Sequence, residues 1–170
     1  MSVLHATVRN IDRFTEGCGR ILAWLVLAMA LLTTVIVIMR YGFNHGSIMA
    51  QESVIYMHGS LFMLAAAYTL KHDGHVRVDI FYRTFSPRRA AWVNSLGAIA
   101  FLMPLCVFIF ISSWDYVTEA WMIRESSPEA GGIPAVFLLK SLIPAMAVTL
   151  FLQALAEVLR NALTLVAPGE

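Results

Sequence analysis

The stretch that decides the fold reads ILAWLVLAMALLTTVIVIM, from Ile21 to Met39, and lies between Arg20 and Arg40. It holds no charged residue and is long enough to cross the ~30 Å hydrocarbon core of a bilayer as a helix. A cleaved secretory signal would have a shorter apolar region that ends in small residues. Because this stretch ends in Val-Ile-Val-Ile-Met directly before Arg40, we expect a retained membrane anchor.

Three more apolar stretches follow, and we expect spans at about 21–39, 53–70, 88–113 and 134–156. They are apolar on all sides, whereas barrel strands would alternate with a period of two, so helices are predicted. Ser86 and Pro87 suit the start of the third span. Pro104 and Pro144 lie inside the third and fourth spans and predict kinks. Pro134 suits the start of the fourth. The sequence therefore predicts an all-α membrane protein with four transmembrane helices, forming a single integral membrane domain over residues 1–170.

Composition agrees with a membrane protein. Hydrophobic residues make up 59% of the chain and charged residues only 14%, whereas soluble domains are near half apolar and a quarter charged. The net charge of +1 gives no indication of a nucleic-acid partner. Cys18 and Cys106 are far apart and form no CxxC motif, so neither a disulfide framework nor a zinc site is expected.

Positive charges are strongly biased to one side of the predicted spans. Those expected on one side are Arg9, Arg13, Arg20, Lys71, Arg77, Arg83, Arg88, Arg89 and Arg160, against Arg40 and Arg124 on the other. Because cytoplasmic loops carry the excess of Lys and Arg, both termini are expected in the cytoplasm. The segment before Arg20 is either a short amphipathic helix at the membrane surface or a continuation of the first span.

Lys140 is the one charge clearly inside a predicted span. Snorkelling or pairing is the expected reason, with contact to a substrate or ion as the alternative. The predicted topology places Lys140 at the same outer level as Arg40, Glu52, Asp115 and Glu119. We expect these residues to form an ion-pair layer that holds the bundle together or grips a partner. Within it, Lys140 should pair with Glu52 or with an acidic residue of the third span.

Motifs of enzyme active sites are missing from the sequence: there is no nucleophile elbow, P-loop, HExxH or GxGxxG. We therefore expect no catalytic residue, no bound cofactor and no metal ion. His58 is the one histidine within a predicted span, and haem would need axial ligands from facing helices. A membrane anchor for a redox enzyme and an autonomous small transporter are the alternatives to a transporter subunit.

The segment YTLKHDGHVRVDIFY, residues 68–82, resembles the hallmark segment of the small membrane subunit of TRAP transporters (tripartite ATP-independent periplasmic transporters), the DctQ type. Other parts of the chain are also similar to that family: Arg40 to Asn44, Gln51-Glu52, Gly131 to Pro134, Lys140 and Pro144. The family often has a Trp and two acidic residues where this chain has Met49, Gln51 and Glu52.

The resemblance implies a place in the bacterial inner membrane and a role without catalysis. In such a system a large permease subunit moves substrate and sodium, and a periplasmic substrate-binding protein captures organic anions such as carboxylates. The small subunit binds the large one as a scaffold.

The residues that we expect to contact partners or support the scaffold are Arg40, Glu52, His75, Arg77, Asp79, Glu119 and Lys140. Arg77 and Asp79 are expected to pin the inner loop to the membrane interface, or else to belong to a partner-binding loop. The outer loop 125–132 is expected to be flexible and to touch the capture protein.

Overall fold

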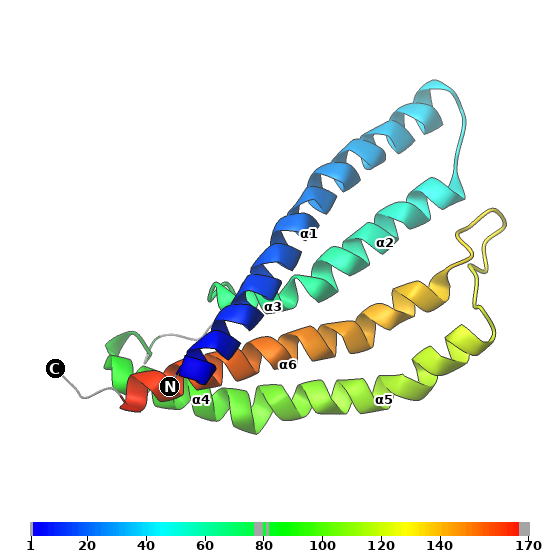
Figure 1. The fold of residues 1–170 in the computed structure, drawn as a ribbon. Coiled ribbons are helices and arrows are strands. Elements are labelled where there is room, and N and C mark those ends of the chain that lie inside the picture. Colours follow the sequence, from blue (N-terminus) through cyan, green and yellow to red (C-terminus); the bar gives the residue numbers. More distant parts are fainter. Residues whose placement is uncertain (1, 77–79, 81, 167–170) are drawn as a thin grey trace.

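The computed structural model describes residues 2–76, 80 and 82–166, and all regular structure in this part of the chain is helical (Figure 1). The elements in chain order are α1 (Ser2–Gly42), α2 (Ile48–Leu64), α3 (Ala66–Lys71), the 3-10 turn η1 (Tyr82–Thr84), α4 (Pro87–Gly97), the π-helical turn η2 (Ala98–Leu102), α5 (Met103–Met122) and α6 (Val136–Val166).

In the part of the chain that the structure describes, four helical stretches are long and apolar enough to cross a membrane, which confirms the predicted all-α, four-span fold. They are Val3–Gly42, Ile48–Lys71, Pro87–Met122 and Val136–Val166. Each extends beyond the apolar stretch seen in the sequence, because helices continue past the hydrocarbon-like residues into polar flanks. In particular, α1 is one continuous helix of 41 residues. The segment before Arg20 is therefore a continuation of the first span and not a separate surface helix.

Local side chains explain where α2 and α4 begin. Ser47 Oγ accepts a hydrogen bond from Ala50 N at 3.3 Å at the start of α2. Ser86 Oγ accepts one from Arg89 N at 3.4 Å, and Pro87 lies in the first turn of α4. A hydroxyl at the N-cap satisfies an amide that has no partner within the helix. The predicted cap at Ser86 is thus confirmed.

Prolines lie inside the third and fourth spans, and the third is irregular beside its proline. The π-helical turn Ala98–Leu102 ends two residues before Pro104. A proline lacks the amide hydrogen, and its ring clashes with the preceding turn, so both disturb the regular hydrogen-bond ladder there. Pro144 lies inside α6. The helix α6 begins at Val136, so Pro134 precedes it and does not open it, contrary to the prediction.

The helix α6 is the centre of the bundle and contacts α1, α2, α3, α4 and α5. Two ends can be distinguished in Figure 1. We call "the loop end" the one that holds segments 43–47 and 123–135, toward which α1 and α2 diverge from α5 and α6. The start of α1, the end of α6 and the described part of the connection between α3 and α4 lie at the other end, called "the termini end".

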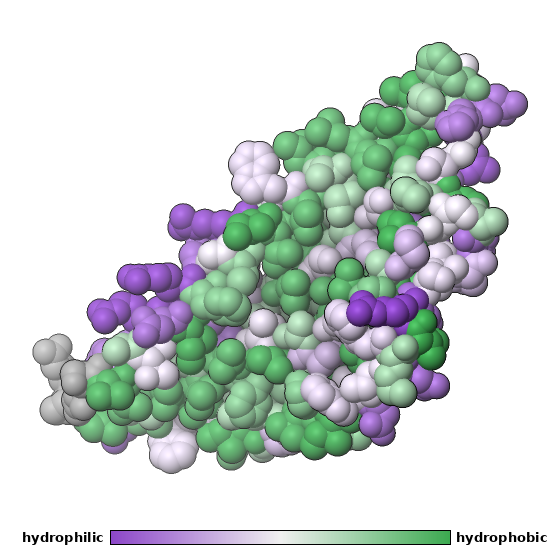
Figure 2. Space-filling model, turned by 45° about the vertical axis from the view of Figure 1, so that its right-hand side comes forward, coloured by the Kyte–Doolittle hydropathy of each residue, from purple (hydrophilic) through white to green (hydrophobic). Residues whose placement is uncertain are grey.

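Small side chains fill the contacts between helices. The buried apolar residues are Leu22, Ala67, Ala91, Ala98, Cys106, Val117, Ala120, Ala147, Ala154 and Ala156. Alanines let helix backbones approach closely, which is how membrane helices gain packing energy without a hydrophobic drive between them. Figure 2 shows hydrophobic residues over the middle of one face and hydrophilic residues toward both ends, as a bilayer requires.

Candidate functional site

Glu52 joins α2 to the loop that precedes α6 at the loop end. Its Oε1 accepts a hydrogen bond from Ser127 Oγ, and its Oε2 accepts one from Ile133 N at 2.6 Å. Ser127 N in turn donates to Ile133 O at 3.2 Å, and Gly132 N donates to Glu129 O at 3.0 Å. The loop expected to be flexible is therefore tied to itself and to α2.

Two glycines make the approach of this loop to Glu52 possible. Gly131 has φ +82°, a left-handed conformation that side chains with a Cβ rarely adopt. A Cβ on Gly132 would lie 2.7 Å from Glu52 Oε1 and within clash distance of Ser127 Oγ. The Gly-Gly pair noted in the sequence is thus required by the shape of the loop.

Lys140 pairs with Glu125, not with the carboxylates that the sequence predicted. The Nζ of Lys140 lies 2.5 Å from Glu125 Oε2 and 3.9 Å from the centre of the Tyr116 ring. Arg124, with φ +51°, turns the chain after α5, and Glu125 N donates to Ala120 O at 2.9 Å. The end of α5 thus places Glu125 beside α6. Glu52 is not the partner of Lys140, because its two oxygens accept hydrogen bonds from the loop before α6.

Arg40, Asp115 and Glu119 do not join this cluster. All three side chains are exposed, and none forms an ion pair within 4.0 Å with another of the residues that the structure describes. The five-residue layer expected from topology is therefore divided: Lys140 and Glu52 have separate partners. Arg40 and Glu119 remain at the surface.

Glu16 is the centre of a charged cluster at the termini end. It accepts hydrogen bonds from Lys71 Nζ at 2.6 Å and Arg20 Nε at 3.0 Å, and it lies 3.0 Å from His72 Nε2. Lys71 Nζ also donates to the backbone O of Asp12 at 3.1 Å. These contacts tie α1 to the end of α3.

A second network at the same end joins α1 to α6 and was not predicted from the sequence. Thr15 Oγ1 donates to Gln153 Oε1 at 2.8 Å, and Gln153 Nε2 donates to Asp12 Oδ1 at 3.1 Å. Arg160 adds bonds of 2.9 and 2.8 Å to the two Asp12 oxygens. Gln153 is fully buried. An uncharged amide within an apolar stretch is the pattern that could have revealed this network.

The hallmark segment ends α3 and turns the chain. Asp73 has φ +54°, and Gly74 N donates to Thr69 O at 2.8 Å, which closes the helix in a Schellman motif. His75 Nε2 lies 3.3 Å from Ala66 O. His75 thus folds back on the first residue of α3, while Arg77 and Asp79 lie outside the described residues.

The sequence model of the family described as "Tripartite ATP-independent periplasmic transporters, DctQ component" matches residues 29–164 of the chain. The chain belongs to this family. It is also 31% identical over 125 residues to the C4-dicarboxylate TRAP transporter small permease protein DctQ of Vibrio cholerae serotype O1. The match covers 70% of this chain and 53% of the relative, so the chain spans about half of that relative's length. No solved structure matches the chain.

The DctQ family is a family of transporter components, and the described part of this member has four helices long and apolar enough to span a membrane. The matched residues include Lys71, Gln153 and Arg160, but their partners Asp12, Thr15 and Glu16 precede the matched region. The part of α1 that precedes the matched region is therefore held to α3 and α6 by hydrogen bonds in which one partner lies outside the family match.

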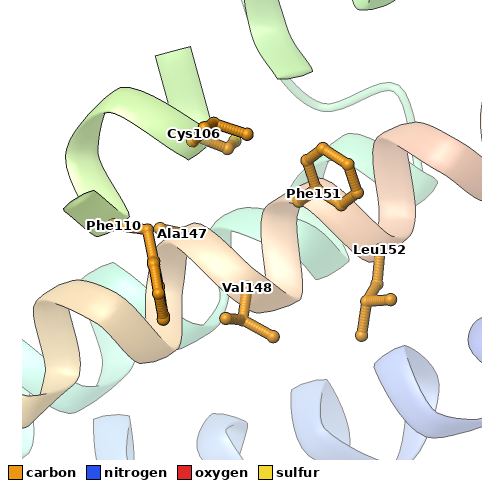
Figure 3. A pocket seen from close by; sticks show the side chains of 7 residues that line it. Cys106, Phe110, Ala147, Val148, Phe151 and Leu152 are labelled. Carbon is orange, nitrogen blue, oxygen red and sulfur yellow. The ribbon is translucent and has the colours of Figure 1, made fainter. Parts of the chain in front are cut away.

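An apolar pocket of about 200 Å³ lies between α5 and α6 of the DctQ-family chain (Figure 3). Its lining residues are Cys106, Val107, Phe110, Ala147, Val148, Phe151 and Leu152. Within the described part of the chain no group of three or more His, Cys, Asp or Glu side chains is placed to hold a metal ion. The chemistry that this chain offers is therefore apolar packing in the middle and polar contacts at both ends.

Proposed function

We propose that this chain is the small, non-catalytic subunit that scaffolds the large permease of a TRAP transporter. The transporter would take up organic anions such as carboxylates, coupled to sodium. The observation that carries the proposal is the DctQ family match over residues 29–164, which covers α2 to α5 and all but the last two residues of α6.

Packing and polar ties support a scaffold. A scaffold must hold its shape while its partner moves, and α6 lies against every other α-helix of the bundle. At the loop end, Glu52 and Lys140 tie the loop before α6 to α2 and to α6 itself. At the termini end, Asp12 and Glu16 tie α1 to α6 and to α3. Side chains that bond across helices stabilise membrane bundles at such points.

We further propose that the termini end faces the cytoplasm of a bacterial inner membrane. The exposed cations Arg9, Arg13, Arg20, Arg83, Arg88 and Arg89 belong to this end. Their excess over the loop end follows the positive-inside rule. The loop end, with its tied loop 125–132, would then face the periplasmic substrate-binding protein. Arg40 and Glu119, both exposed there, are proposed to contact partners and not each other.

Co-purification tests the scaffold function. The tagged chain is co-expressed with the large permease subunit of its transporter and extracted in mild detergent. We expect a stable complex of the two, and uptake of a carboxylate by proteoliposomes only when the permease, the binding protein and a sodium gradient are all present. A chain that never retains the permease would refute the scaffold role. Uptake by the chain alone would establish the autonomous transporter, and haem absorbance in the purified chain would favour the redox anchor.

A further inference from the structure

His58 is an exposed polar side chain near the middle of the second span. It lies 10 residues after Ile48 and 13 before Lys71, the ends of that span. At 1.5 Å per residue these separations are about 15 and 20 Å. With this span centred in a bilayer, the imidazole lies within the ~30 Å hydrocarbon core.

Neither ring nitrogen of His58 has a hydrogen-bond partner among the described residues. The one aromatic ring that stacks on it among the described residues is that of Phe62, one turn further along, with centroids 6.3 Å apart. Acyl chains offer no hydrogen bonds, so an unpaired imidazole at this depth is unfavourable. Long Lys and Arg side chains can snorkel to the interface, but a histidine side chain is too short to cover such a distance.

Four exposed residues of α2 form a regular line: Gln51, Ile55, His58 and Phe62. Ile48 and Met49 at the start of the helix are also exposed, and no residue of α2 is fully buried within the bundle. The spacing of four, three and four residues from Gln51 to Phe62 places these residues on one face of the helix. The two polar members are seven residues apart, and so are the two apolar members. This is the spacing with which one helix packs along another in a membrane bundle.

We propose that Gln51, Ile55, His58 and Phe62, the α2 seam, form the face that packs against a transmembrane helix of the large permease subunit. That helix carries a hydroxyl, amide or carboxyl group opposite His58. The proposal rests on the proposed function and names the surface by which the scaffold holds its partner. A second copy in the same membrane orientation would set the two His58 rings against each other, and one bond between them would leave a nitrogen of each ring unpaired.

Site-specific photo-crosslinking tests the seam in the co-expressed complex. The photoreactive p-benzoylphenylalanine replaces Phe62 of α2 or, as a matched control, Phe108 of α5. The two side chains have the same chemistry and similar exposure, 72% and 66%. We expect an adduct with the large permease subunit from position 62 and none from position 108.

The following outcomes would contradict either the α2 seam or the proposed function. An adduct from position 108 but not from 62, in a complex that co-purifies, would overturn the seam and leave the proposed function intact. An adduct of twice the 18.9 kDa mass would show a second copy as the occupant. Adducts with lipid alone would overturn the seam too. A wild-type chain that fails to retain the permease would overturn the proposed function itself.

Substitution of His58 tests the hydrogen bond separately. The loss of one interhelical hydrogen bond in a membrane weakens binding about three- to twenty-fold. We expect His58→Phe to raise the dissociation constant of the permease complex by that factor, and His58→Gln, which still donates and accepts, to stay within about twofold. Both variants should keep the helical circular dichroism of the wild type, because His58 is exposed. Equal affinity of His58→Phe and the wild type would overturn the hydrogen bond.

Discussion

Replacing Gly19 with alanine should leave the bundle less stable than the same change at Gly17. Both glycines lie inside α1, so both substitutions gain the same helix propensity, about 1 kcal/mol. Gly17 has no atom within 4 Å of an added Cβ. At Gly19 the added Cβ would lie 2.1 Å from Cδ2 and 2.5 Å from Cγ of Tyr68.

The size of the effect follows from these distances. Carbon atoms pack at about 3.5–4.0 Å, so the Tyr68 ring must move by more than about 1 Å to admit the methyl group. Tyr68 is not free to do so cheaply, because its ring packs against His72 with centroids 4.4 Å apart, and His72 contacts Glu16. Overpacking of this kind costs about 1–3 kcal/mol. Since helix propensity cancels between the two variants, Gly19→Ala should be less stable than Gly17→Ala by about the same 1–3 kcal/mol.

Reversible unfolding by SDS in mixed micelles, followed by circular dichroism, measures this difference directly. The free energies of unfolding should rank Gly17→Ala above the wild type and Gly19→Ala below Gly17→Ala. If both alanines stabilise the protein equally, Tyr68 does not pack across Gly19 and the close approach of α1 to α3 is wrong.

Two further predictions concern the ends of the bundle. Gly132→Ala should release the loop from Glu52 and speed hydrogen exchange in residues 123–135, whereas Gly46→Ala, which meets no atom within 4 Å, should leave exchange unchanged; equal protection in both variants would contradict the tie. The substitutions Thr15→Val and Gln153→Leu should show a coupling free energy of about 0.6–1.7 kcal/mol in a double-mutant cycle measured by SDS unfolding, and additive effects would mean that this hydrogen bond contributes no stability.

Features that depend on neighbouring residues along the chain could be predicted. The four spans follow from runs of apolar residues, because burial in lipid depends on the composition of each segment itself. The cap at Ser86 follows from the Ser-Pro pair in the same way. The need of Lys140 for a partner was also evident, because a charge within a span is costly wherever its neighbours lie.

Partners across the bundle could not be predicted in this way. The predicted topology places Glu52 and Lys140 at the same depth in the membrane. Several acidic residues lie at that depth, and the sequence does not say which of them pairs with Lys140. Arg124, in the left-handed conformation, turns the chain so that Glu125 lies beside Lys140. The oxygens of Glu52 accept hydrogen bonds from the loop before α6 instead. Nothing along the chain pairs Gln153 with Thr15, and only the packing of α1 on α6 brings the two side chains together and buries the amide fully.

The sequence by itself determined that this chain has four stretches long and apolar enough to cross a membrane and resembles the DctQ family, because apolar length and the hallmark segment are properties of contiguous residues. Only the tertiary structure decided which side chains meet and which are left facing outward. Thr15 and Gln153 are separated by 138 residues, and their contact depends on how α1 packs on α6. The outward position of His58 has the same origin, since it is the packing of α2 against its neighbours that leaves this face uncovered.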